Sequence, residues 1–193
     1  MGMPPCSLTC DEAGDQCVPA CPATAQSGCK TAGKSIVTRK RSDDGSRDKL
    51  VWKWLRGQPT TLADFGTPTA TTDYALCLYG GPAMTLLPGG QLAVPPSATV
   101  WAPHGNIGWS YRDPAAAADG VQRVLLKGSD AERSKITLKG KGASLPDPMM
   151  PVSPASFPLV VQLLNDETST CWQSTFSVDD VTRNDAERFK ARK

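Results

Sequence analysis

Hydrophobic and polar residues alternate along several short segments of this chain, which is the pattern of a half-buried β-strand. Trp52 and Trp54 share one face of such a segment, and that face is expected to point into the core. Ile136 and Leu138 share a face in another segment, opposite polar side chains. Glycine, proline and aspartate clusters separate these segments at intervals typical of all-β proteins. The pattern predicts nine strands, at residues 35–40, 49–56, 74–79, 99–101, 108–112, 121–127, 135–139, 159–164 and 171–177.

Alternation of this kind suits antiparallel sheets that pack one face on a core. We therefore predict an all-β fold, an antiparallel two-sheet β-sandwich, over residues 34–178. Residues 1–33 are rich in cysteine, proline and small side chains and lack hydrophobic periodicity, which indicates an irregular N-terminal segment. Residues 179–193 are polar, with Thr182 or Asn184 as a cap and basic residues at the end, which predicts a short C-terminal helix or a polar tail.

The seven cysteines add a constraint on compartment and cross-linking. Five are crowded near the N-terminus, and two stand alone in the β region: Cys6, Cys10, Cys17, Cys21 and Cys29, then Cys77 and Cys171. This usage indicates an oxidising compartment. We expect Cys77 and Cys171 to bond to each other inside the β domain, the alternative being two buried free thiols.

The spacing of the first five cysteines, C-x3-C-x6-C-x3-C-x7-C, favours a disulfide framework over a structural metal site. Because five is an odd number, at least one is free, bonded to Cys77 or Cys171, or bonded outside this chain. An intermolecular bridge through the odd cysteine is one expected route to a homo-oligomer. Strand addition at a sheet edge is the other.

Export signals and overall charge narrow the expected location and partners. No stretch reaches the roughly 20 apolar residues of a membrane-spanning helix, and the N-terminus lacks the pattern of a signal peptide. Since the cysteines indicate an oxidising compartment, we expect an extracellular protein whose sequence continues upstream of Met1. The net charge of +2 is too small to indicate nucleic acid or an anionic membrane as the partner.

Catalytic signatures are weak, and we predict no catalytic residue. His104 is the only histidine and lies in a Gly/Pro-flanked loop. The sequence contains no G-x-S-x-G motif, which would supply a serine nucleophile for a catalytic histidine to activate. Loop carboxylates are expected to stabilise turns. They also leave open a carbohydrate-active hydrolase with a carboxylate pair assembled in space, or a calcium-dependent binding module. Calcium is thus the one cofactor left open, and no metal-ligating residue is assigned.

His104 and the aromatic residues around it are the best candidates for ligand binding. Trp101, Trp109 and Tyr111 flank that loop, where they either form a platform for a protein or glycan ligand or belong to the core.

Several motifs occur in an order that resembles a known module. They are the run from Cys21-Pro22-Ala23-Thr24 to Cys29, residues 48–54 and 71–79, and Cys171-Trp172-Gln173. The chain resembles a cysteine-containing secreted β-domain of unknown function that recurs in proteins of myxobacteria and related environmental bacteria. That resemblance implies a secreted domain in which a cysteine-rich stretch leads into the β body. The additional cysteines common in that module before the segment Gly108-Trp109-Ser110-Tyr111 are absent from residues 97–104 here.

Together these observations predict a non-catalytic extracellular structural, adhesion or assembly module that is part of a larger secreted protein. The hydrolase and the calcium-dependent binder are the alternatives.

Overall fold

The computed structural model describes residues 8–10, 17–19, 21–145 and 150–193. Within these ranges the chain forms strands joined by turns, and its helical pieces are three 3-10 turns of three residues each. Each of the nine predicted segments overlaps a strand, which confirms the all-β class. The strands are β1 (Leu8–Cys10), β2 (Cys17–Pro19), β3 (Lys30–Lys40), β4 (Lys49–Gly57), β5 (Tyr74–Gly80), β6 (Thr85–Val94), β7 (Trp101–Pro103), β8 (Gly108–Arg112), β9 (Val121–Lys127), β10 (Ser134–Lys141), β11 (Leu159–Asn165), β12 (Cys171–Phe176), β13 (Val181–Asn184) and β14 (Arg188–Arg192). The 3-10 turns are η1 (Ala63–Phe65), η2 (Pro154–Ser156) and η3 (Val178–Asp180).

Twelve strands, β3 to β14, belong to one hydrogen-bonded sheet. Its main path runs β6-β5-β11-β12-β3-β4-β10-β9-β8-β7, and the hairpin of β13 and β14 joins it where β14 pairs with β3. β1 and β2 form a separate two-stranded sheet.

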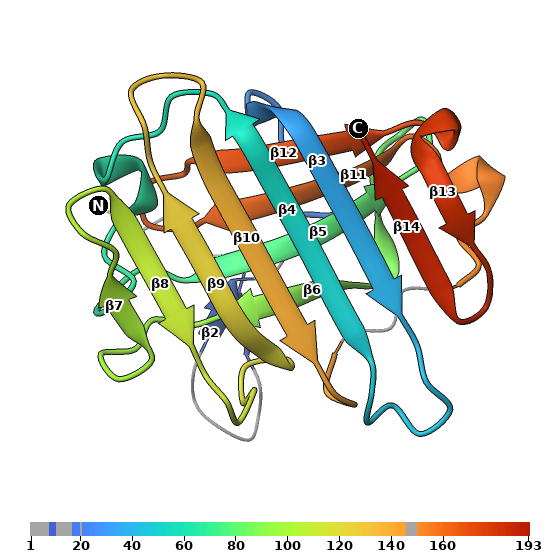
Figure 1. Cartoon of the computed structure of the whole chain (residues 1–193), viewed down its shortest axis with the longest axis horizontal. Helices are drawn as coiled ribbons and strands as arrows, with labels where there is room; N and C mark the ends of the chain where they lie inside the picture. Colours follow the sequence, from blue (N-terminus) through green and yellow to red (C-terminus); the bar gives the residue numbers. More distant parts are fainter. Residues whose placement is uncertain (1–7, 11–16, 20, 146–149) are drawn as a thin grey trace.

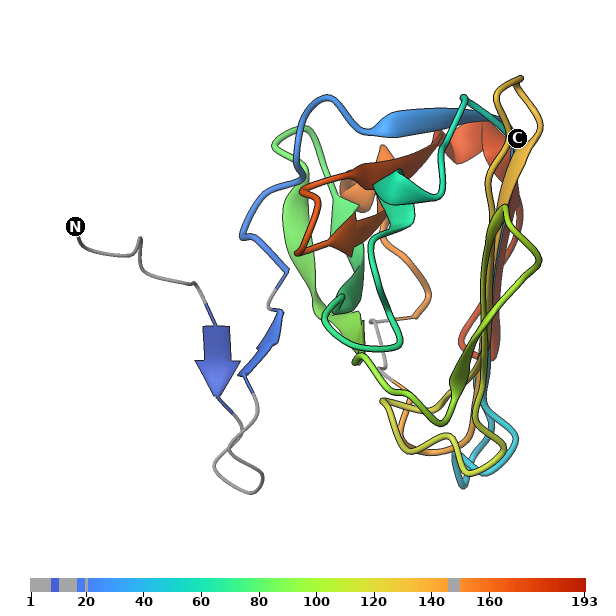
Figure 2. The same cartoon turned by 90° about the vertical axis from the view of Figure 1, so that its left-hand side faces the viewer.

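Strand β3 links two layers of this sheet. Lys30 and Thr31 pair with β12, whereas residues 36–40 pair with β14. The front layer comprises β3, β4, β7–β10, β13 and β14, and the back layer comprises β5, β6, β11 and β12; the two lie one behind the other in Figure 1 and face each other in Figure 2. The expectation of two separate antiparallel sheets needs correction, because the hydrogen bonding continues through β3 and the β12–β3 pair is parallel.

The main hydrophobic core lies between the layers. Trp52 and Trp54 of β4 are fully buried, which confirms that their face of the strand points inward. The indole Nε1 of Trp52 donates to Ser174 Oγ at 3.0 Å, and that of Trp54 donates to the Gln173 carbonyl at 3.1 Å. These bonds satisfy the polar atoms that burial of a tryptophan brings into a core and tie the front layer to β12.

A second cluster covers the outer face of the back layer. β5 and β11 are buried along their whole length, and their sequences are apolar apart from Gln162 and Asn165 of β11. Residues 21–29 lie over this face, and Thr24 forms a β-bridge with Thr85.

Two disulfides fasten residues 21–29 to the back layer. Cys21 bonds to Cys77 and Cys29 bonds to Cys171, with Cα–Cα distances of 5.7 and 4.7 Å. The predicted bond between Cys77 and Cys171 is therefore wrong. β11 runs between β5 and β12, and Cys77 and Cys171 lie opposite Gln162 and Leu164, which are two residues apart on β11. The two cysteines are therefore separated by more than two strand spacings of about 9–10 Å in total, which is beyond the reach of a disulfide.

A buried glutamine on β11 holds the same segment. Gln162 has no exposed surface; its side chain accepts from the Gln26 backbone N–H at 3.0 Å and donates to the Gln26 carbonyl at 2.7 Å. The amide thus pairs with Gln26 as a neighbouring strand would.

The C-terminal helix predicted within residues 179–193 is not formed. β13 and β14 make a hairpin there, and Phe189 and Ala191 are buried in the core while Arg192 faces solvent. Alternation of this kind buries one face of a strand. The C-terminal residues are therefore part of the sheet, and β3 also runs through the boundary expected between residues 33 and 34.

Candidate functional site

The four residues proposed as an aromatic binding site separate in the structure. Trp101 and Tyr111 lie opposite each other on β7 and β8, are 3% and 2% exposed, and have ring centroids 5.1 Å apart. Trp109 is half-buried against the core, and His104 is exposed in the β7–β8 loop, where its backbone N–H donates to the Gly108 carbonyl at 2.8 Å. Because Trp101 and Tyr111 are buried in the core, the four candidate residues do not form an exposed platform.

The remaining cysteine candidates lie near the N-terminus. Cys10 and Cys17 are directly opposite each other in the register of β1 and β2. Cys6 lies outside the described residues.

Loop carboxylates bind the protein's own backbone. Asp113 accepts from the N–H groups of Ala115 and Ala117 at 2.9 and 2.8 Å, and Asp119 accepts from Ala93 N–H at 2.8 Å. Such bonds order the loops between strands. Among the described residues, no group of three or more histidine, cysteine or acidic side chains is placed to hold a metal ion.

Three acidic residues meet where residues 66–73 approach the β11–β12 turn. Glu167 accepts hydrogen bonds from the hydroxyls of Thr72 and Thr71 and from Thr67 N–H, and these bonds lower its pKa. Asp166 accepts from the Asp73 backbone N–H at 2.8 Å. Burial, reinforced by the charge of Asp166, raises the pKa of Asp73 to about 6.

Charged residues are divided between strands and loops. Seventeen of the 21 lysines and arginines lie in strands, all of them in the front layer, whereas none of the 19 acidic residues lies in a described strand. The alternation of buried and exposed positions places thirteen cations on the outer face of that layer. We call this surface the basic face; its cations are Lys34, Lys40, Lys49, Lys53, Arg112, Arg123, Lys127, Lys135, Lys139, Lys141, Arg188, Lys190 and Arg192.

One row of cations crosses four strands of the basic face. Arg188, Lys40, Lys49 and Lys141 lie opposite one another in register on β14, β3, β4 and β10. Opposite residues in antiparallel strands have Cβ atoms about 4.5–5.5 Å apart. The register therefore forms a continuous line of positive charge across the layer.

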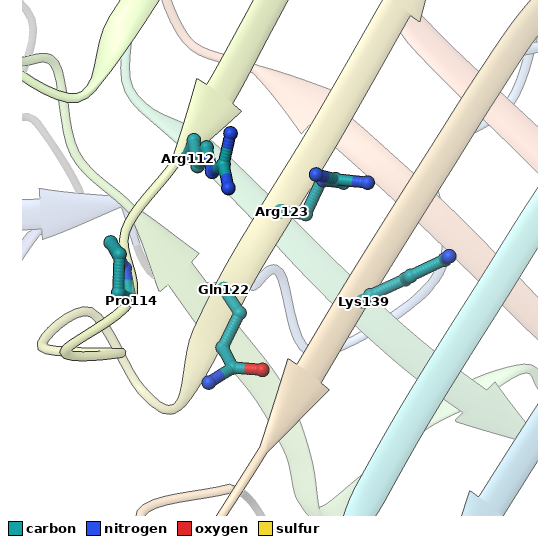
Figure 3. A pocket seen from close by; sticks show the side chains of 5 residues that line it. All are labelled: Arg112, Pro114, Gln122, Arg123 and Lys139. Atoms are coloured by element: carbon teal, nitrogen blue, oxygen red, sulfur yellow. The ribbon is translucent and has the colours of Figure 1, made fainter.

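A second row borders a hollow. Lys139, Arg123 and Arg112 lie opposite one another on β10, β9 and β8. Together with Pro114 and Gln122 they line a hollow of about 340 Å³. Figure 3 shows the three cationic side chains spread across the neighbouring strands and the Gln122 side chain extending from β9 in a different direction.

These rows have no carboxylate partners within the described part of the chain. The ion pairs that do form there lie elsewhere, joining Lys30 to Asp64, Arg39 to Asp48 and Arg183 to Asp185. Like charges directly opposite each other destabilise a sheet, by up to about 1 kcal/mol per pair. An anionic ligand would remove that repulsion, so the basic face can attract and hold negative charge.

Sequence reasoning missed the basic face because it relied on net charge, which cancels strand cations against loop carboxylates. The missed signal is the recurrence of basic residues at every second position of a strand, as in Lys139 and Lys141 or Arg188, Lys190 and Arg192.

Comparisons with known proteins add no further assignment. No protein-family model matches the chain, and no curated protein or solved structure matches it. Within the described residues, no helix is long and apolar enough to cross a membrane.

Proposed function

We propose that this chain is a non-catalytic extracellular adhesion or assembly module that contacts an anionic macromolecule through its basic face. In this proposal the molecule works as a two-layer β-sandwich, with the front layer as the binding surface and the back layer as its support. The observation that carries the proposal is the register of unpartnered cations across β8, β9, β10, β4, β3 and β14.

The disulfides support the extracellular part of the proposal. Bonds such as Cys21–Cys77 and Cys29–Cys171 suggest an oxidising environment outside the cell. Secretion as part of a larger protein, and kinship with the myxobacterial module, stay predictions. Self-association through a sheet edge or a cysteine also stays a prediction.

A hydrolase or calcium-dependent binder has weaker support. The carboxylates of Asp113, Asp119 and Glu167 already accept hydrogen bonds from backbone N–H groups or hydroxyls. The basic face, in contrast, presents charges that the described chain leaves without a partner.

Two triple variants test the proposal at equal net charge. Lys40→Gln, Lys49→Gln and Lys141→Gln together interrupt the four-strand row, whereas Arg47→Gln, Arg133→Gln and Lys193→Gln remove three exposed cations that lie outside the strands. Binding is measured on beads carrying a sulfated polysaccharide, polyglutamate or duplex DNA.

We expect the wild-type protein and the second variant to bind at least one polyanion in about 100 mM salt. The first variant should bind it at least about tenfold more weakly, because a row of close charges attracts a polyanion more strongly than scattered ones. Failure of the wild-type protein to bind any of the three, or equal losses in both variants, would refute the proposal.

A further inference from the structure

We propose that the hollow beside Arg123 recognises one acidic sugar unit, carrying a carboxylate or sulfate group, within a linear anionic polysaccharide. This inference rests on the proposed function and names the ligand of its binding face. It goes beyond that function because it locates the binding site of one sugar unit at the hollow, where positive charge, a concave surface and a hydrogen-bonding amide occur together.

Charge and concavity coincide at this place. Arg112, Arg123 and Lys139 come from three adjacent strands, and the register sets them side by side around the hollow of about 340 Å³. Two guanidinium groups offer forked N–H donors that match the paired oxygens of a carboxylate or sulfate. A single anionic group can therefore contact several cations at once.

A neutral hydrogen-bonding side chain adds to the charge. Gln122 is the extra residue of β9 where its register with β10 shifts between Lys139 and Gly140. A bulge re-aims the side chain at such a position, and Gln122 lines the same hollow as the three cations. An amide that both donates and accepts suits the hydroxyl groups of a sugar ring.

The placement of aromatic residues argues against single-stranded nucleic acid as the ligand. All six aromatic side chains on the front-layer strands belong to the core or pack against it: Trp52, Trp54, Trp101, Trp109, Tyr111 and Phe189. Single-stranded nucleic acid is usually held by bases stacked on exposed aromatic rings. The basic face offers no such ring among its described strands, and Pro114 supplies the apolar part of the hollow.

Single substitutions on the basic face distinguish specific binding in the hollow from non-specific electrostatic attraction by the whole face. Arg123→Gln removes one charge from the hollow, Arg123→Lys keeps that charge but loses the forked donors, and Gln122→Ala removes the amide. Lys53→Gln is the matched control, since Lys53 lies on the same face on β4 and does not line the hollow. Affinity is measured by calorimetry with a sulfated hexasaccharide, and with duplex DNA and polyglutamate as competing probes.

We expect Arg123→Gln to weaken hexasaccharide binding at least about tenfold and Arg123→Lys and Gln122→Ala about three- to tenfold, whereas Lys53→Gln changes it less than about threefold. Equal losses for Arg123→Gln and Lys53→Gln, or wild-type affinity of Arg123→Lys, would overturn the site while leaving binding by the basic face intact. Tighter, Arg123-dependent binding of DNA or polyglutamate would overturn the sugar as ligand. Absence of binding to all three probes would instead overturn the proposed function.

Discussion

At the scale of single residues, buried polar side chains determine which distant segments meet. Gln162 binds the backbone of Gln26, and Ser174 receives the Trp52 indole N–H and donates to Ser35 Oγ at 2.8 Å. A buried polar atom without a partner costs about 1–3 kcal/mol, so these bonds strongly favour the observed packing. Alternation predicted that Trp52 points inward, but it carries no information about a partner 122 residues away.

The carboxyl group of Asp73 gives a pH-dependent prediction at the same scale. Its pKa is raised from 3.8 to about 6 by burial and by Asp166, so the folded state holds this proton more tightly than the unfolded state does. Stability is therefore highest when the group is protonated and falls as the pH rises from about 4 to 6. Asp73→Asn should stabilise the protein at about pH 7.5, by about 1 kcal/mol after allowance for partial exposure.

Thermal melts at two pH values check this prediction. The gain from Asp73→Asn should largely disappear near pH 4, where the wild-type carboxyl is protonated in the folded state. Asp43→Asn, in an exposed loop, serves as the control for removing one negative charge. An equal gain at both pH values, or the same gain from Asp43→Asn, would contradict the account.

At the scale of elements, most strands of the β body were predictable from the sequence, whereas β6 and the C-terminal hairpin were not. β6 was missed because Pro88, Gly89 and Gly90 interrupt it, and such residues ordinarily indicate a turn. They are accommodated because β6 is the last strand on one side of the sheet and its register with β5 shifts between Cys77 and Tyr79. At the C-terminus, cap residues and terminal charges predicted a helix, while the alternation of Phe189 and Ala191 with basic residues indicated the strand that forms.

Phe189→Ala tests whether the C-terminal hairpin belongs to the core. Phe189 is 3% exposed and packs in the core between the layers, so truncation should lower the free energy of unfolding by about 3–5 kcal/mol. Urea denaturation of the purified protein measures the change.

Val178→Ala is the matched control, because Val178 lies just before the hairpin and is 57% exposed. It should change the free energy of unfolding by less than about 0.5 kcal/mol. If Phe189→Ala proved as mild as Val178→Ala, residues 188–192 would be a loose tail rather than a strand of the sheet.

At the scale of the whole molecule, neither the net charge nor the number of cysteines indicated how the charges and the cross-links are arranged. A net charge of +2 concealed a sheet face of thirteen cations, because every acidic residue that the structure describes lies outside the strands. The cysteine count indicated cross-linking correctly but not its pattern. Pairing depends on which strands are neighbours, and β11 between β5 and β12 directs Cys77 and Cys171 to Cys21 and Cys29.

The layered arrangement also explains how one face becomes available for binding. The outer side of the back layer is covered by residues 21–29 and their disulfides, whereas the outer side of the front layer carries exposed cations. The disulfides of Cys21 and Cys29 hold residues 21–29 on the back layer, on the side of the molecule opposite the basic face.

An NMR titration of the isotope-labelled protein with the sulfated hexasaccharide tests the central claim most directly. We predict that the largest amide shift changes fall on β8, β9 and β10, around Arg112, Arg123 and Lys139, and that β5 and β11 in the back layer stay nearly unchanged. Largest changes around His104 or around Asp73 and Glu167, or no changes at any ligand concentration, would contradict the claim that this protein binds through its basic face.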